Sequence, residues 1–318
     1  MFLRGTKLSC GAAVGCIGAS YAELYGRLSL APFEPGAPAS TAPQTGRLLS
    51  ERCLETTVMS VLGLYSKFAM QVCNTTRFDN DALLRRLIAE GPAAAERGGR
   101  GLVTVSNHVT AVDDPGVVAT LIPPTHFAAP QHLRWQMCAA DRCFKKRALL
   151  PFFRGGRVLP VQRGGGPHHH FIDDTVRKLE AGDWVHVFPT GRRDPDSRTL
   201  GQLKPGVGRM IASAEPPPVV VPFYHYGMER IQRLKEGEVV PLTFGANMHV
   251  VVGEPLEFGP LVREYRANGH SEQQLHAAIV ATIDGAMRGL QARALARADA
   301  DTSGRSNLDR PKWPWSKG

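Results

Sequence analysis

The chain has 318 residues, of which 43% are hydrophobic, so it is long enough for one large α/β domain with a full core or for two small domains. Its formal net charge of +9 favours contact with anionic surfaces, either nucleic acid or acidic lipid. The sequence has neither an aromatic-interleaved RNA-binding motif nor cysteine and histidine at zinc-finger spacing, so a nucleic-acid-binding protein is not expected.

The N-terminal segment has the composition of a targeting sequence. Arg4 and Lys7 precede an uncharged stretch at 8–22 that is rich in Gly, Ala and Ser, and the first acidic residue is Glu23. This pattern favours a mitochondrial targeting segment; a secretory signal and a terminus without any address are the alternatives. Residues 33–44 are rich in Pro, Ala, Ser and Thr, which is typical of a linker. We therefore expect residues 1–50 to form a targeting and linker segment.

A helical pattern follows this linker. The apolar residues that recur at helical spacing are Leu54, Val58, Val61, Leu62, Tyr65, Phe68 and Val72. Between positions 56 and 76 the only charged residue is Lys67. Such a composition lies between those of a soluble core helix and a transmembrane helix, and it predicts an N-terminal helix at the membrane interface. Packing in the core and spanning the membrane are the two alternatives.

From about position 81 onward, helical and strand patterns alternate along the chain. Helices are expected near 81–90, 171–180 and 207–214, and strands at 102–106, 157–161, 184–188, 219–223, 239–244 and 249–252. This order predicts an α/β fold with a mixed, mostly parallel sheet flanked by helices.

A long helix is expected near the C-terminus. Ser271 and Gln274 form a capping box that predicts where it begins. The residues expected on its buried face are Leu275, Ile279, Ile283, Ala286 and Leu290. From Arg297 onward the composition becomes polar and irregular, so we expect one domain at 51–297 and a tail at 298–318.

Cysteine and histidine usage argues against a metal site. The six cysteines contain no Cys-x-x-Cys pair, so reduced thiols are expected rather than a disulfide framework or a zinc site. They are Cys10, Cys16, Cys53, Cys73, Cys138 and Cys143. Three consecutive histidines at 168–170 have no further ligand at a suitable spacing, and no bound metal is expected.

The stretch at 102–115 carries the main chemical signal, because an apolar run delivers His108 and, five positions later, Asp113. The run predicts a buried strand that ends at the rim of a sheet, where open α/β folds bind ligands. His108 is then a general base and Asp113 its orienting partner; a structural histidine is the alternative. Two other His and Asp pairs have this spacing, but they follow a glycine-rich loop rather than a strand.

Three further segments accompany the His108 motif. Residues 155–163 read Gly-Gly-Arg-Val-Leu-Pro-Val-Gln-Arg, 182–192 end in Phe-Pro-Thr-Gly-Arg, and 219–223 read Val-Val-Val-Pro-Phe. In this order and spacing the four segments resemble the glycerolipid acyltransferases, and the stretches at 133–135, 139–144, 182–186 and 225–228 are similar to the tafazzin branch of that family. The resemblance covers about 54–257 and implies a fold of the glycerolipid-acyltransferase type.

The resemblance implies an O-acyltransferase in which a lysophospholipid hydroxyl attacks an acyl ester. His108 would take the proton of the hydroxyl, and Asp113 would fix the tautomer of the imidazole and stabilise its charged form. The hydroxyl attacks directly, so neither a covalent acyl-enzyme nor a cofactor is expected.

The acceptor lipid carries a phosphate, which planar guanidinium groups bind well. Arg163 is the first candidate to bind it and Arg157 the second, with a plain surface charge as the alternative for each. The turn formed by Pro189, Thr190 and Gly191 would present backbone N–H groups to the phosphate or to the developing oxyanion.

The third segment departs from the family pattern, which usually reads Phe-Pro-Glu-Gly. This chain has Thr190 in place of the glutamate, and threonine can neither carry the charge nor reach as far. Acceptor positioning is then altered, or the adjoining Arg192 and Arg193 compensate in a different arrangement.

The tafazzin resemblance implies acyl exchange between phospholipids and lysophospholipids without coenzyme A, cardiolipin remodelling, and a mitochondrial membrane location. The implied partners are cardiolipin, phosphatidylcholine and their lyso forms, together with an anionic membrane surface. Two alternatives stay open: an acyl-CoA-dependent lysophospholipid acyltransferase, and a non-catalytic lipid-binding protein, which the Thr190 substitution motivates.

Overall fold

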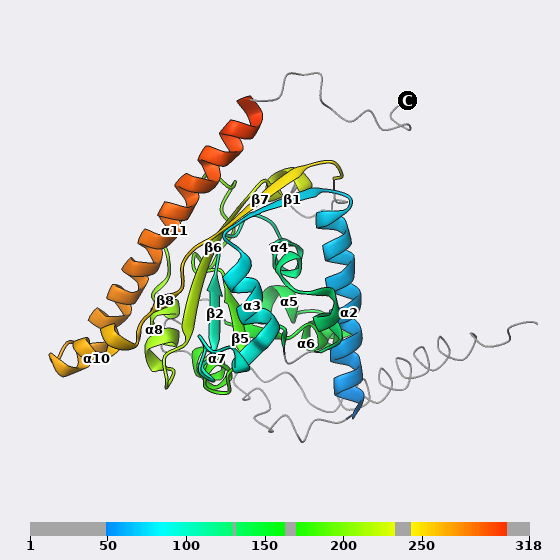
Figure 1. Cartoon of the computed structure of the whole chain (residues 1–318). Coiled ribbons are helices and arrows are strands. Elements are labelled where there is room, and N and C mark those ends of the chain that lie inside the picture. Colours follow the sequence, from blue (N-terminus) through cyan, green and yellow to red (C-terminus); the bar gives the residue numbers. More distant parts are fainter. Residues whose placement is uncertain (1–48, 130–131, 163–169, 233–242, 304–318) are drawn as a thin grey trace, which may run out of the picture.

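The computed structural model describes residues 49–129, 132–162, 170–232 and 243–303, and these form one mixed β-sheet between two layers of helices (Figure 1). The strands lie in the order β1-β7-β6-β2-β5-β3-β4, and β8 pairs with β6 off this path. Their bounds are β1 (Thr75–Asp79), β2 (Leu102–Val105), β3 (Trp135–Ala139), β4 (Val158–Val161), β5 (Trp184–Val187), β6 (Val219–Tyr226), β7 (Asn247–Val252) and β8 (Leu256–Glu257).

Most neighbouring strands in this sheet are parallel. β2 pairs with β5 and β6, β3 pairs with β4 and β5, and β1 pairs with β7, all in parallel register. β7 and β8 run antiparallel to β6. The central strands β2, β5 and β6 are buried along their whole length, as expected where helices cover both faces. The predicted fold class is therefore confirmed.

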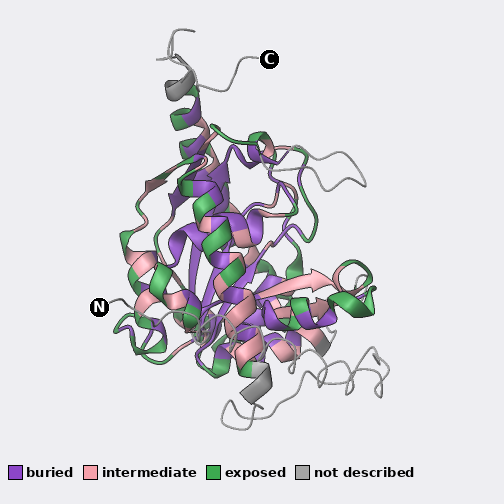
Figure 2. Ribbon diagram, turned by 90° about the vertical axis from the view of Figure 1, so that its right-hand side faces the viewer, coloured by how far each residue is buried: buried purple, intermediate pink, exposed green. Residues whose placement is uncertain are grey.

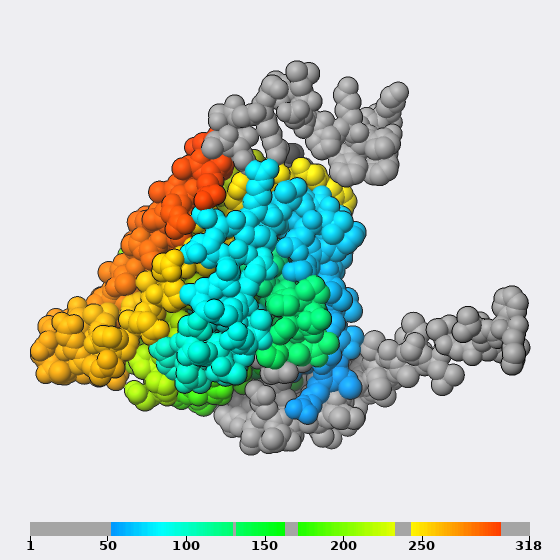
Figure 3. All heavy atoms as spheres, in the orientation of Figure 1, coloured from blue at the N-terminus to red at the C-terminus, as the bar shows by residue number. Residues whose placement is uncertain are grey.

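Helices cover the two faces of the sheet and enclose two hydrophobic cores. On one face lie α2 (Leu49–Gln71), α3 (Ala82–Glu90) and α4 (Asp113–Leu121), and on the other lie α7 (His170–Glu180), α8 (Pro205–Ser213), α10 (Gly259–Ala267) and α11 (Glu272–Ser303). Three short helices, α5 (Ala140–Cys143), α6 (Leu150–Gly155) and α9 (Met228–Ile231), follow strands or turns. The central strands are buried between helices whose outer faces are exposed (Figure 2), and α2 and α11 lie on opposite sides of the molecule (Figure 3).

The alternation of side chains along each strand assigns residues to the two cores. Leu102 packs into the core beneath α2, α3 and α4, whereas Val103 and Val105 pack beneath α7, α8 and α11. Thr104 points to the same face as Leu102 by this alternation. The polar residues that follow β2 therefore emerge beside α4.

Most of the predicted elements are present with small shifts of their ends. The Ser271 capping box is confirmed, because Gln274 N donates to Ser271 Oγ at 3.2 Å and Ser271 N donates to Gln274 Oε1 at 2.9 Å. Helix α11 continues past Arg297 to Ser303, and β6 extends to Tyr226 rather than ending at 223. The elements that were not predicted are strands β1, β3 and β8 and helices α4, α5, α6, α9 and α10. The strand expected at 239–244 lies outside the described residues over 239–242, and the described positions 243 and 244 are not part of a strand.

Helix α2 turns its apolar stripe away from the protein. Its small residues face inward, and a Cβ on Gly63 would lie 2.3 Å from the ring of Phe127. The exposed apolar stripe, 49–67% exposed, consists of Val61, Leu64, Tyr65 and Phe68 on α2 and of Val72, which directly follows the helix. This face therefore does not pack in the core. Among the described residues, no helix is long and apolar enough to cross a membrane.

The expectation of reduced thiols throughout is wrong for one pair of cysteines. Cys138 near the end of β3 and Cys143 at the end of α5 form a disulfide, with Cα atoms 6.2 Å apart. The turn from strand to helix folds the chain back within five residues, which the sequence spacing did not reveal. Cys53 and Cys73 are free, and Cys10 and Cys16 lie outside the described residues.

The contact between α8 and α11 depends on a glycine. A Cβ on Gly208 would lie 2.4 Å from the backbone oxygen of His276, whereas the nearest atom to a Cβ on Gly206 is a side-chain carbon 3.5 Å away. We expect Gly208→Ala to lower the free energy of unfolding by roughly 1–3 kcal/mol, because the two helices must separate. Gly206→Ala on the same helix should leave stability unchanged or raise it by up to about 1 kcal/mol. Urea unfolding measures both, and equal effects would contradict this packing.

Candidate active site

The candidate site lies where β2 leaves the sheet. His108 follows the strand by three residues, and its side chain is 21% exposed. The ring stacks on Phe188, with centroids 3.9 Å apart and an angle of 14° between the planes. Phe188 directly follows β5, the parallel neighbour of β2, so two adjacent strands deliver the two rings to the same edge of the sheet. Stacking restricts the ring while one side of it remains open.

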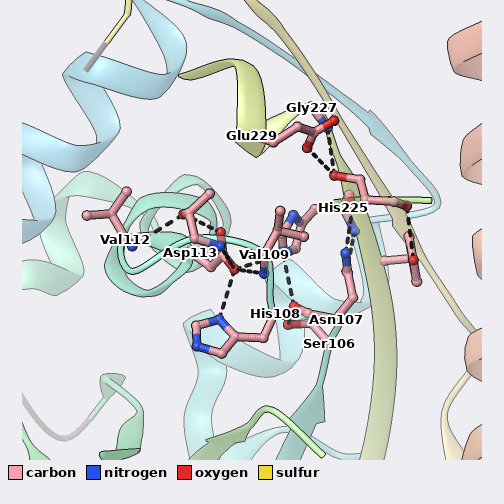
Figure 4. Close-up of polar contacts among 12 residues, drawn as sticks. Ser106, Asn107, His108, Val109, Val112, Asp113, His225, Gly227 and Glu229 are labelled. Carbon is pink, nitrogen blue, oxygen red and sulfur yellow. Dashed lines mark hydrogen bonds and ion pairs between the residues drawn. The ribbon is translucent and has the colours of Figure 1, made fainter. Parts of the chain in front are cut away.

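Asp113, the first residue of α4, forms a hydrogen bond with the His108 ring (Figure 4). Its Oδ2 lies 3.0 Å from His108 Nδ1 and accepts from the backbone N–H groups of Val109 and Thr110, and its Oδ1 accepts from Thr110 Oγ1 at 2.6 Å. Burial alone would raise the pKa of Asp113, but His225 and the hydrogen bonds from His108 and Thr110 outweigh it, so the pKa lies below its ordinary value of 3.8.

The charge of Asp113 decides which nitrogen of His108 is free. An ionised carboxylate can only accept hydrogen bonds, so Nδ1 of His108 must carry the proton. In the neutral imidazole, Nε2 is then the bare nitrogen. The geometry that the sequence predicted for His108 and Asp113 is thus present, with Nε2 in position to accept a proton.

A second histidine reaches the same carboxylate from the opposite side. His225 Nε2 lies 3.7 Å from Asp113 Oδ2 and donates to the backbone oxygen of Asn107 at 3.0 Å. The Asn107 side chain in turn bonds to the backbone of His225: its Nδ2 donates to His225 O and its Oδ1 accepts from His225 N, both at 2.9 Å. Both residues are fully buried. Burial lowers the pKa of His225 even though Asp113 raises it.

A buried polar chain supports the strand that carries the site. Trp184 Nε1 donates to Thr104 Oγ1 at 2.9 Å, and the Thr104 hydroxyl lies 2.9 Å from His186 Nδ1. His186 Nε2 lies 3.4 Å from Ser106 Oγ. Because Ser106 Oγ donates to Asn107 O at 3.0 Å, it accepts from Nε2 of His186, and Nδ1 of the ring then accepts from the Thr104 hydroxyl. Burial lowers the pKa of His186 to about 4, so it is a neutral core residue and not a second base.

A buried ion pair fixes the start of α4. Arg134 Nε lies 2.8 and 2.9 Å from the two carboxylate oxygens of Asp114, and both side chains are almost fully buried. This pair links the segment before β3 to the residue next to Asp113. The sequence contained both residues inside motifs but gave no sign that they pair with each other.

The predicted phosphate-binding arginines have different environments. Arg157 is 2% exposed: its Nε pairs with Glu55 at 2.7 Å, its Nη1 donates to Leu133 O, and its guanidinium stacks over Trp135 at 4.4 Å. Phosphate binding by Arg157 therefore requires this internal ion pair to open, and it stays a prediction. Arg163 lies outside the described residues.

Several polar groups of the turn after β5 form hydrogen bonds within the protein. Gly191, with φ of 66°, donates its N–H to Phe188 O at 3.0 Å, and buried Thr190 donates its hydroxyl to Arg192 O at 2.7 Å. The carbonyl of Pro189 accepts from Lys204 N. Arg192 is exposed. The Gly191 N–H is thus engaged within the turn, and Arg192 is the member of this group that presents its side chain to solvent.

Asp194 was not among the site residues predicted from the sequence. Its backbone N–H donates to His108 O at 2.7 Å, which ties the loop after β5 directly to the histidine. Its side chain is buried and accepts from Gly201 N at 3.2 Å, and burial raises its pKa. Within the described part of the chain there is no group of three or more side chains that could hold a metal ion.

Comparison with known proteins gives consistent matches. The family model described as Acyltransferase matches residues 86–226. The chain is 33% identical to Tafazzin of Drosophila melanogaster, over 74% of this chain and 60% of that protein, and 32% identical to Tafazzin of Saccharomyces cerevisiae, over 54% and 55%. It is also 32% identical to N-acylphosphatidylethanolamine synthase of Arabidopsis thaliana, over 64% of this chain and 70% of that protein. The match thus spans little more than half of the length of these two tafazzins.

The hydrogen bonds between His225 and Asn107 predict that His225 positions the backbone of His108 and Asp113. His225→Phe removes the donor at Nε2 and should lower the turnover number by roughly 10- to 100-fold with little change in KM, because His108 and Asp113 lose a fixed backbone. His225→Gln keeps a donor near the Nε2 position and should restore most of the rate. Steady-state kinetics with a check of the thermal midpoint measures this; equal losses in both variants, or a rise in KM alone, would contradict it.

The buried His186 makes stability depend on pH. Between pH 6.5 and about 4 the unfolded chain binds a proton at His186 that the folded protein excludes, so stability falls as the pH falls through this window. The loss from this residue is about 3 kcal/mol. His186→Gln, which is neutral throughout, should show a shallower decline than the wild type in urea unfolding at several pH values. His270→Gln at the surface serves as the control and should leave the slope unchanged.

Proposed function

Because this chain belongs to the tafazzin-like acyltransferases, we propose that it moves fatty acyl chains between phospholipids and lysophospholipids, with cardiolipin among its substrates. The observation that carries the proposal is the state of His108: Asp113 holds Nδ1 at 3.0 Å, and Nε2 is left bare on a partly exposed ring. A base of this kind is what an alcohol nucleophile needs near neutral pH.

In the proposed reaction, Nε2 of His108 takes the proton of the lysophospholipid hydroxyl as its oxygen attacks the carbonyl carbon of a donor ester. Asp113 stabilises the imidazolium that forms. The tetrahedral intermediate then collapses, the bond to the donor glycerol oxygen breaks, and His108 returns the proton to that oxygen. One ester is exchanged for another, so the step needs neither coenzyme A nor a covalent acyl-enzyme.

The acceptor phosphate is proposed to contact the loop after β5. Arg192 is exposed there, two residues from Asp194, whose N–H is bonded to the backbone of His108. A guanidinium so placed suits a phosphate diester. Arg163 and Arg157 remain further candidates for this role. Pro189, Thr190 and Gly191 shape the turn that presents Arg192.

Transfer to an amine is the second candidate function. The match to N-acylphosphatidylethanolamine synthase covers 70% of that protein, a larger share than for either tafazzin above. Thr190 also replaces the glutamate of the usual family motif and directs its hydroxyl into the loop rather than outward. A neutral amine would use the same base, because His108 would accept its proton during attack.

The proposed location is a mitochondrial membrane, with the protein held at its surface. The exposed apolar stripe of α2 fits insertion at the membrane interface, whereas the lone charge of this part of the helix points away from the stripe. Lys67 Nζ donates to Thr120 O and Ile122 O at the end of α4, at 3.2 and 2.9 Å. Burial lowers the pKa of Lys67 to about 8.

Acyl transfer from labelled phosphatidylcholine to monolysocardiolipin in liposomes, without coenzyme A, tests the proposal. His108→Ala should reduce the rate by at least about 100-fold, the lower range for loss of a general base. His270→Ala, a surface histidine, should retain the wild-type rate. Equal activity of His108→Ala and the wild type would overturn the proposal.

A further acceptor, a further donor and a binding measurement separate the alternatives. Product on the amine of phosphatidylethanolamine would favour N-acylation, and a strict need for acyl-coenzyme A would favour the acyl-CoA-dependent enzyme. Liposome binding with no transfer to any acceptor would favour a non-catalytic lipid-binding protein.

A further inference from the structure

The sheet gathers cationic segments at the edge that carries His108. Strands β2, β5 and β3 are neighbours and run parallel, so the segments that follow them leave the sheet at the same edge. After β2 comes the His108 motif, after β5 the turn with Arg192 and Arg193, and after β3 the segment that begins with α5. Open α/β sheets bind their ligands at this edge.

We name the exposed cations of these segments the basic rim: Arg142, Lys145, Lys146, Arg147, Arg192 and Arg193. Asp141 is the single acidic residue in the stretch 140–154, against five cations when Arg154 is included. The part of the rim formed by Arg192 and Arg193 is close to the chemistry, because the bond from Asp194 N to His108 O joins their loop to the base.

Apolar side chains accompany these charges. Leu149 and Phe152, which follow Arg147 in the sequence, are each 43% exposed. Helix α6, which carries Phe152, packs against α2, since a Cβ on Gly155 would lie 3.1 Å from Val58 (Figure 1). The basic rim thus continues into α6, which touches the helix that bears the exposed apolar stripe.

We propose that the basic rim, with Leu149 and Phe152, docks the protein onto bilayers rich in anionic phospholipid and turns His108 toward that surface. The inference rests on the proposed function, because it names the surface from which the lipid substrates are taken. Exposed cations next to exposed apolar groups suit a lipid headgroup layer, where the cations meet phosphates and the apolar groups enter the acyl boundary. Nucleic acid would satisfy the charges but would leave Leu149 and Phe152 in water.

The test is binding of the full chain to liposomes at physiological ionic strength. Vesicles of phosphatidylcholine alone are compared with vesicles in which about 30 mol% phosphatidylglycerol supplies the negative charge. Each cation near an anionic surface contributes about fivefold in partitioning. The triple variant Lys145→Gln, Lys146→Gln, Arg147→Gln should therefore bind acidic vesicles on the order of 100-fold more weakly than the wild type.

A matched variant controls for net charge. Arg263→Gln, Arg266→Gln, Arg288→Gln removes the same charge from α10 and α11, on the other face of the sheet, and should bind within about threefold of the wild type. His108→Ala should bind as the wild type does, which separates docking from transfer. Equal weakening in both triple variants, or wild-type binding by the rim variant, would overturn the proposal. A stronger, salt-dependent affinity for duplex DNA or RNA than for acidic vesicles would overturn it as well.

Discussion

The arrangement of the site depends on one buried carboxylate. Asp113 sits at the start of α4, is almost fully removed from solvent, and stays ionised because donors surround it: two backbone N–H groups, the Thr110 hydroxyl and Nδ1 of His108. An unpaired buried charge would be costly, so the loop after β2 is held in the conformation that supplies these donors. The tautomer of His108, and with it the free Nε2, follows from that requirement.

The surrounding sheet brings together the groups that hold Asp113 and His108 in place. Parallel strands bring the segments after β2 and β5 and the last residues of β6 together, and each supplies a contact: the donors after β2, the stacking ring of Phe188 after β5, and His225 near the end of β6. Asn107 joins β2 to β6 by paired hydrogen bonds with the His225 backbone. The edge that completes the base also carries the basic rim, so one architectural feature orients both the reaction centre and the proposed membrane contact.

The local part of this design could be predicted from sequence, but the long-range part could not. His108 and Asp113 lie five residues apart after a strand, and their contact depends on one turn whose pattern is visible. His225 lies 117 positions from His108 and reaches Asp113 only through the pairing of β2 with β6. The burial of Arg157 could not be predicted, because its partner Glu55 lies on a helix about a hundred positions earlier. The Cys138–Cys143 disulfide was missed because it depends on the tight turn from β3 into α5.

The central claim is that Asp113 keeps the proton of neutral His108 on Nδ1. Nitrogen NMR of the histidine-labelled protein near neutral pH measures this directly, because protonated and bare ring nitrogens differ strongly in chemical shift. The account predicts a protonated Nδ1 and a bare Nε2 for His108, and loss of this preference in Asp113→Ala. A proton on Nε2, or an unchanged tautomer in the variant, would contradict it.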